Sequence, residues 1–152
     1  MQGDQKILKY LNEVLKAELT AINQYFLHAK MCENWGYYRL ADKNREESIS
    51  EMDHAEKLMQ RILFLEGTPN MTEIGPIKVG TDVKAQLESD LALEMEHATD
   101  IGDNASRQLF EQILVDEEEH VDYLEGQLHA LAEVGLENYL SQQLHKGEDE
   151  KD

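Results

Sequence analysis

The chain has 152 residues, 32 acidic and 14 basic side chains, and a formal net charge of −18. This length suits one domain with a buried core, and the acidic excess argues against nucleic acid or an anionic membrane as a partner, because both require a basic surface. The single cysteine, Cys32, excludes a disulfide framework and indicates a reducing cytoplasm. We expect no signal peptide and no membrane span, because no apolar run is long enough.

Four long segments show apolar residues with a period near 3.6, and we expect helices at about 5–33, 38–65, 82–101 and 105–133. Thr81 is the expected N-cap of the third helix. Residues 67–80 contain three glycines and both prolines, so they should form a crossover that spans the bundle and leaves the second and third helices parallel. A turn at 102–104, a short fifth helix at about 136–145 and a frayed acidic tail complete the prediction. The expected fold is an all-α, antiparallel four-helix bundle with one long crossover, in one domain over residues 1–152.

Each of the four long helices carries at least one acidic residue on its apolar face, and two helices add a histidine three residues later. These residues are Glu18, Glu51 with His54, Glu94, and Glu117 with His120. Buried carboxylates repel one another unless a cation compensates, and no lysine or arginine lies on these faces nearby. Two divalent ions would balance four carboxylates, and oxygen and imidazole ligands suit iron, manganese or zinc. Glu94 also has a histidine three residues later, His97, which we expect to be exposed to solvent.

Five stretches carry a resemblance to a known family: LNEVLKAELTAINQYFLHAKM, REESISEMDHAEKLMQRILFLEG, SDLALE, ILVDEEEHVDYLE and GLENYL. They resemble the bacterioferritins over nearly the whole chain. The resemblance implies a ferroxidase centre in which Glu51 and Glu117 bridge two irons, Glu18 and Glu94 each bind one iron, and so do His54 and His120. Tyr25 would lie close to this centre and donate an electron, or it is a core tyrosine with a satisfied hydroxyl.

Met52 lies about 100° round the helix from Glu51, in an outer apolar strip with Ile49 and Met59. The first helix has a matching strip of Leu19, Asn23 and Phe26. Apolar strips on outer faces usually mark a subunit interface. The resemblance implies more: haem b bound without a covalent link at a two-fold dimer interface, with Met52 of each subunit as an axial ligand of the haem iron.

The spacing between Glu94 and Glu117 departs from the family pattern. The expected turn comes 8 residues after Glu94 but about 13 before Glu117, a mismatch of about 7 Å that would leave the fourth helix overhanging. Family members have a longer third helix. Either the hairpin is shortened or a segment is absent from the sequence, and the second is favoured because such a loss should damage the core. Glu46 and Ser50 stand where some family members have the histidine and aspartate of an inner-surface iron site, so no such site is predicted.

The predicted function is iron storage by a ferroxidase. The protein would oxidise Fe(II) with O2 or H2O2 and keep a ferric mineral inside a homo-oligomeric cage of 24 subunits, which by resemblance assembles from dimers. The haem would carry electrons inward from a small ferredoxin when iron is released. One alternative is a non-storage di-metal oxidase or peroxidase like rubrerythrin, although its usual CxxC iron domain is excluded by a single cysteine. The other is a structural bundle without metal, which leaves the inward acids unexplained.

Overall fold

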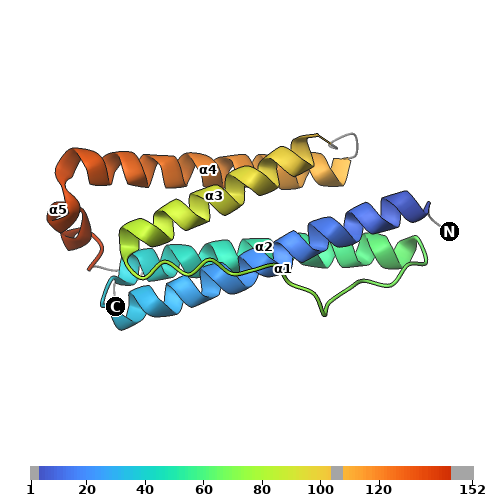
Figure 1. Cartoon of the computed structure of the whole chain (residues 1–152), viewed down its shortest axis with the longest axis horizontal. Coiled ribbons are helices and arrows are strands. Elements are labelled where there is room, and N and C mark those ends of the chain that lie inside the picture. The colour runs from blue at the N-terminus through green and yellow to red at the C-terminus, as the bar shows by residue number, and fades with distance from the viewer. Residues whose placement is uncertain (1–3, 104–107, 145–152) are drawn as a thin grey trace, which may run out of the picture.

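The computed structural model describes residues 4–103 and 108–144. Its five helices are α1 (Gln5–Asn34), α2 (Tyr38–Phe64), α3 (Val83–Gly102), α4 (Gln108–Val134) and α5 (Leu136–Ser141). Figure 1 shows α1 paired with α2 and α3 paired with α4, with α5 folded across one end of the bundle. The prediction of an all-α four-helix bundle with a short fifth helix is confirmed. No helix among the described residues has both the length and the apolar character needed to cross a membrane.

The observed helix ends differ slightly from the predicted ones. Thr81 is not the N-cap of α3, because the Asp82 carboxylate takes that role and accepts a hydrogen bond from Ala85 N at 2.8 Å. An aspartate caps a helix at least as well as a threonine, so the helix begins one residue later than predicted. The helix α4 is described from Gln108, and its predicted start at 105 lies outside the described residues, as does the tail. The fifth helix is shorter than predicted: it ends at Ser141, and residues 142–144 are not helical. That residues 1–152 form one domain stays a prediction.

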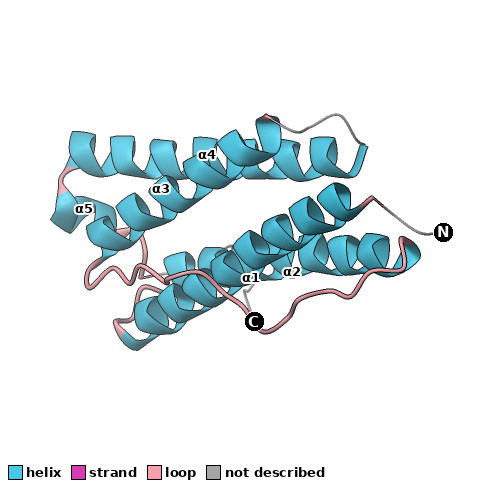
Figure 2. Cartoon of the chain, turned by 45° about the vertical axis from the view of Figure 1, so that its right-hand side comes forward, coloured by secondary structure: helices cyan, strands magenta, loops and turns pink. Residues whose placement is uncertain are grey.

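The crossover between α2 and α3 runs along α1 (Figure 2), and hydrogen bonds join it to that helix. Backbone N–H groups of the crossover donate to side chains of α1, at distances of 2.7 to 3.2 Å. The pairs are Asn70 with Asn12, Gly75 with Thr20, Lys78 with Gln24, and Gly80 with His28. The acceptors are four or eight residues apart and therefore share one face of α1. This connection returns the chain to the start of the bundle, so α2 and α3 run parallel (Figure 1).

A second link fixes the end of the crossover. Asp90 on α3 accepts a hydrogen bond from the Gln24 amide at 2.8 Å and contacts His28 Nδ1 at 2.9 Å. Gly80 lies so close to the backbone of Gln86 that an added Cβ would come within 2.3 Å of the Gln86 nitrogen. Only glycine therefore fits at this position, and α3 can start directly against α1.

Two apolar clusters fill the bundle, one on either side of its middle. Leu11, Leu15, Leu58, Ile62, Ile101, Phe110 and Ile113 belong to the first cluster, and Cys32, Leu40, Val83, Leu87, Leu124, Leu131 and Tyr139 to the second. These residues follow the predicted helical period, and burial of such side chains is the main force that holds the helices together. Between the two clusters the inward positions are occupied by acids and histidines.

The expected overhang of the fourth helix stays a prediction, because residues 104–107 lie outside the described residues. The helix α3 continues for eight residues beyond Glu94, to Gly102, and α4 is described from Gln108, nine residues before Glu117. The helices α1 and α2 project past the described parts of α3 and α4 (Figure 1), because each has 13 residues between its acid and this end of the bundle. The shortened hairpin still packs, since Ile101, Phe110 and Ile113 are buried.

Candidate metal centre

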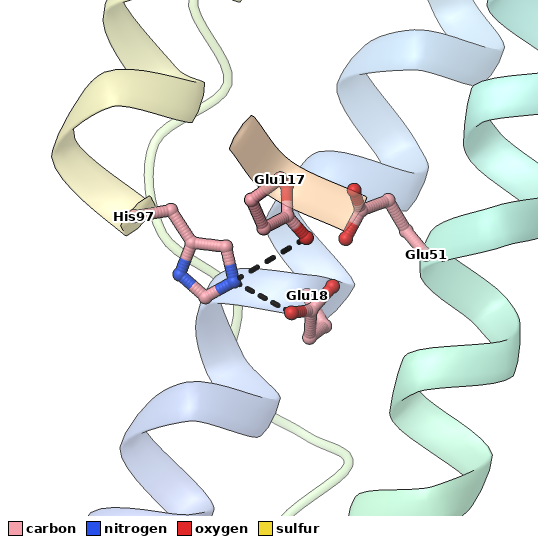
Figure 3. A group of neighbouring side chains, drawn as sticks. All are labelled: Glu18, Glu51, His97 and Glu117. Carbon is pink, nitrogen blue, oxygen red and sulfur yellow. Dashed lines mark hydrogen bonds and ion pairs between the residues drawn. The ribbon is translucent and has the colours of Figure 1, made fainter. Parts of the chain in front are cut away.

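The four long helices bring all six predicted ligands together in the middle of the bundle. Each of these side chains is at most 4% exposed: Glu18, Glu51, His54, Glu94, Glu117 and His120. They come together because each lies on the apolar face of its helix, within one or two turns of the core leucines and isoleucines. Figure 3 shows carboxylates from α1, α2 and α4 converging on one small volume.

The ligand atoms fall into two overlapping groups. In the first, which we call the Glu18 group, atoms of Glu18, Glu51, His97 and Glu117 all lie within 4.8 Å of one another. In the second, the Glu94 group, the same holds for Glu51, Glu94, Glu117 and His120. Glu51 and Glu117 belong to both groups. Two cation positions that share two carboxylates are the arrangement of a dinuclear centre.

Unsatisfied polar atoms mark this centre within the part of the chain that the structure describes. Seven buried side-chain atoms there have no hydrogen-bond partner, and all seven belong to the six predicted ligands. They are Glu18 Oε2, Glu51 Oε2, His54 Nδ1, Glu94 Oε2, both oxygens of Glu117, and His120 Nδ1. Most buried polar atoms in proteins are paired, as His28 and Asp90 are here. The orphaned atoms are carboxylate oxygens and imidazole nitrogens, the donor types that bind iron, manganese and zinc, so a pair of divalent cations fits this site.

Without a metal, repulsion between like charges drives apart the pKa values of two carboxylates of the Glu94 group, Glu94 and Glu117. Burial raises the pKa of Glu117, and the adjacent Glu94 raises it further. Burial also opposes ionisation of Glu94, but a hydrogen bond from protonated Glu117 and the nearby His120 lower its pKa to about 2. The metal-free centre therefore keeps a proton on Glu117, which serves as the donor that the ionised carboxylates lack. Cations would displace this proton.

His54 is held by carboxylates on both sides of its ring. His54 Nδ1 lies 3.2 to 3.4 Å from oxygens of Glu18, Glu51 and Glu117, while its Nε2 contacts Asp116 Oδ2 at 2.7 Å. A carboxylate on the far nitrogen orients the ring, so that the near nitrogen faces the cation. Burial lowers the pKa of His54, but the contacts with Glu18 and Asp116 outweigh it and the pKa is raised.

His120 occupies the corresponding place in the Glu94 group. Its Nδ1 lies 3.1 Å from Glu94 Oε1 and 3.4 Å from Glu47 Oε2. Glu47, in turn, is paired with Lys43 at 3.0 Å. The Tyr25 ring packs edge-to-face on the His120 ring with centroids 5.0 Å apart. Tyr25 is fully buried, and its hydroxyl donates to Glu94 Oε1. The structure thus places this tyrosine beside the predicted centre, on a carboxylate of the Glu94 group.

Sequence reasoning missed two residues of this site. The expectation that His97 is exposed is wrong: its side chain is 5% exposed, and its Nε2 lies 2.6 Å from Glu18 Oε1 and 3.9 Å from Glu117 Oε1 (Figure 3). Its spacing from Glu94 was the available signal, because residues three apart share a helix face. Asp116, the partner of His54, was also missed, and no periodic signal distinguishes it from its acidic neighbours.

The predicted haem residues lie on the outer surface of α1 and α2. Phe26, Ile49 and Met52 are each about half exposed, at 48%, 51% and 53%. Leu19 and Met59 are partly buried against the first core cluster, and the Asn23 amide donates to the Leu19 carbonyl at 2.8 Å. Exposed apolar side chains around an exposed thioether give a surface suited to an apolar cofactor or to a second subunit. The haem role of these residues stays a prediction.

A four-helix fold with clustered carboxylates and histidines between its helices is typical of the ferritin-like class. The family model for the ferritin-like domain matches residues 8–134. Curated relatives are similar over nearly the whole chain. A bacterioferritin of Mycobacterium leprae is 49% identical, over 93% of this chain and 96% of the relative. A bacterioferritin of Brucella melitensis is 47% identical, over 91% and 92%. A bacterioferritin of Mycobacterium tuberculosis is 47% identical, over 93% and 96%.

The chain belongs to the bacterioferritin family, and its function is iron storage. The carboxylate and histidine cluster is compatible with a di-iron site. A non-storage di-metal enzyme is not favoured.

Proposed function

We propose that the cluster is a ferroxidase centre that takes two Fe(II) ions as substrate. Glu51 and Glu117 would bridge the two ions, because they alone belong to both ligand groups. Glu18 and His54 would bind one ion, and Glu94 and His120 the other. The observation that carries this proposal is the set of seven orphaned buried atoms, all of which belong to these six side chains.

The reaction removes one electron from each Fe(II). With O2 as oxidant, two electrons and two protons give H2O2; with H2O2 as oxidant, two electrons and two protons give two waters. The carboxylates favour this change, since hard oxygen ligands stabilise the more highly charged Fe(III). Iron binding displaces the proton from Glu117, whose pKa is raised in the metal-free centre. The ferric product then leaves for the mineral store.

Tyr25 is the residue best placed to supply a further electron. Its hydroxyl already donates to Glu94, so the phenol proton has an acceptor within the centre. Burial and the nearby Glu94 raise the pKa of Tyr25 well above its ordinary value. The phenol is therefore neutral at physiological pH, and loss of an electron would be coupled to transfer of this proton to the carboxylate.

Storage requires an enclosed space, and we propose that dimers of this chain assemble into a cage of 24 subunits in the cytoplasm. The half-exposed strip of Phe26, Ile49 and Met52 supports a role in the dimer contact. At a two-fold axis this strip would present one thioether from each subunit, and two thioethers suit the axial positions of a haem iron. Haem b would supply one-electron transfer when bound. A small ferredoxin would be the electron donor for iron release.

The ferroxidase proposal is tested by Glu51→Ala, with the exposed α2 residue Glu56 changed to alanine as the matched control. Glu51 belongs to both ligand groups, so its loss should remove the centre, and initial Fe(II) oxidation by O2 should fall at least tenfold in stopped-flow absorbance. The control variant should oxidise Fe(II) at the wild-type rate. An unchanged rate in Glu51→Ala would show that oxidation takes place elsewhere.

The haem proposal is tested by Met52→Leu, with Met95→Leu as control. Both methionines are about half exposed, at 53% and 49%, but Met95 lies on α3, away from the strip. After reconstitution with haem b, wild type and the control should show a Soret band with bis-thioether character that Met52→Leu lacks. Identical spectra for all three proteins would reject Met52 as a ligand.

A further inference from the structure

His97 gives the centre a third imidazole. It lies one helical turn after Glu94 on α3, is buried, and directs Nε2 toward the carboxylates rather than away from them (Figure 3). Among the described residues, His97 is the one histidine in the Glu18 group as defined above. The bacterioferritin pattern that the sequence resembles assigns one histidine to each iron, His54 and His120, and leaves His97 without a role.

The two cation positions differ in the number of imidazoles that face them. At the Glu18 group, His97 Nε2 lies 2.6 Å from Glu18 Oε1, and His54 Nδ1 lies 3.4 Å from the other oxygen of Glu18. At the Glu94 group, the one histidine of the described residues that contacts the terminal carboxylate is His120, whose Nδ1 lies 3.1 Å from Glu94 Oε1. The carboxylates are balanced, with one terminal glutamate for each position and two shared. The asymmetry therefore comes from His97 alone.

The separation of His97 and Glu18 is close to what two neighbouring ligands of one ion require. Metal–nitrogen and metal–oxygen bonds are about 2.0–2.2 Å long, so two ligand atoms at a right angle on one ion are about 3 Å apart. The observed 2.6 Å between Nε2 and Oε1 has to open by only about 0.4 Å. A small rotation of either side chain is enough.

The other side of the His97 ring opens toward the outside of the bundle. His97 lines a cleft between α1 and α3 together with Glu13, Ala17 and Asp100. Neutral imidazole has one nitrogen that donates and one that accepts. With Nδ1–H turned toward this cleft, Nε2 keeps its lone pair for an ion, as a ligating histidine must.

We propose that His97 is a ligand of the cation at the Glu18 group, so that this position has two imidazoles and the Glu94 position has one. The inference rests on the proposed di-metal centre. Because imidazole is a good ligand for zinc and ferrous iron, the Glu18 position binds a divalent cation more tightly than the Glu94 position, and it fills first.

Zn(II) tests this proposal without any redox reaction. In calorimetric titrations of the assembled metal-free protein, wild type should bind two Zn(II) per subunit at the centre in two steps of unequal affinity. His97→Gln should weaken the tighter step at least tenfold and bring the two steps together. His129→Gln is the matched control, because His129 is exposed on α4, and it should titrate like wild type.

A crystal structure of the Zn(II)-loaded wild type separates a ligand from a residue that only orients Glu18. The proposal predicts a zinc ion at the Glu18 group with His97 Nε2 at about 2.0–2.1 Å. It is overturned if zinc occupies this position while Nε2 stays bonded to Glu18 and beyond bonding distance of the metal. Two bound ions without His97 would leave the ferroxidase proposal intact, whereas no bound ion at either group would reject both. The wild-type crystal decides even if His97→Gln does not assemble.

Discussion

Replacing Glu117 with leucine should stabilise the metal-free protein. Both oxygens of this buried side chain lack a donor, and a proton shared with Glu94 relieves only one of them. An unsatisfied buried polar atom costs about 1–3 kcal/mol. The change of side-chain shape and the loss of the hydrogen bond from Glu117 to Glu94 offset part of this gain, together by about 1.5 kcal/mol. The expected net gain is about 1 kcal/mol, which raises the melting temperature by about 2–4 °C for a chain of this size.

Bound metal should make wild type more stable than Glu117→Leu, the reverse of the order expected without metal. Ligand at a hundred times its dissociation constant stabilises a protein by about 2.7 kcal/mol per site, and Glu117→Leu removes a bridging ligand of both positions. Differential scanning calorimetry of the assembled protein in EDTA and in Zn(II) gives both comparisons. Glu118→Leu, at the exposed neighbouring position on α4, is the control. It should change the free energy of unfolding by less than about 0.5 kcal/mol, both in EDTA and in Zn(II). If Glu117→Leu is less stable than wild type in EDTA by about 1 kcal/mol or more, the Glu117 carboxyl group has its hydrogen-bond partners in the metal-free protein, and the reasoning is wrong.

Three further predictions concern the surroundings of the centre. Asp116→Asn should weaken Zn(II) binding about 10–100-fold in titration calorimetry, because the carboxylate orients His54; unchanged affinity would contradict this role. Tyr25→Phe should slow Fe(II) oxidation while two Zn(II) still bind, because only the donor to Glu94 is lost; an unchanged rate would leave Tyr25 a core residue. The metal-free protein should melt at lower temperature as pH rises from 6 to 9. The pKa of Glu117 and of the three site histidines is raised, so the stability they contribute is complete below their ordinary pKa and is lost as pH passes the raised one. A melting temperature that rises over this range in EDTA would contradict the assigned shifts.

Helical periodicity was sufficient to predict the bundle and the meeting of its acids. Glu18, Glu51, Glu94 and Glu117 stand on apolar stripes, and a side chain on such a stripe has to face the interior. The same rule applied to His97, which is three residues from Glu94. The prediction that it is exposed was wrong because a single acid and histidine three residues apart in an acidic helix is, on its own, weak evidence for a metal ligand.

Other features depend on contacts that a one-dimensional pattern does not contain. The crossover follows α1 because side chains such as Asn12, Thr20 and His28 accept its backbone N–H groups, and nothing in the sequence pairs these residues. Asp116 contacts His54 through the tertiary fold alone.

The most direct test of the account is anomalous scattering at the iron edge from crystals soaked anaerobically in Fe(II). The account predicts two iron peaks per subunit, one within bonding distance of Glu18 and the other of Glu94, with Glu51 and Glu117 between them. Crystals saturated with Fe(II) that show no iron in the bundle interior, with these four carboxylates unchanged, would contradict it.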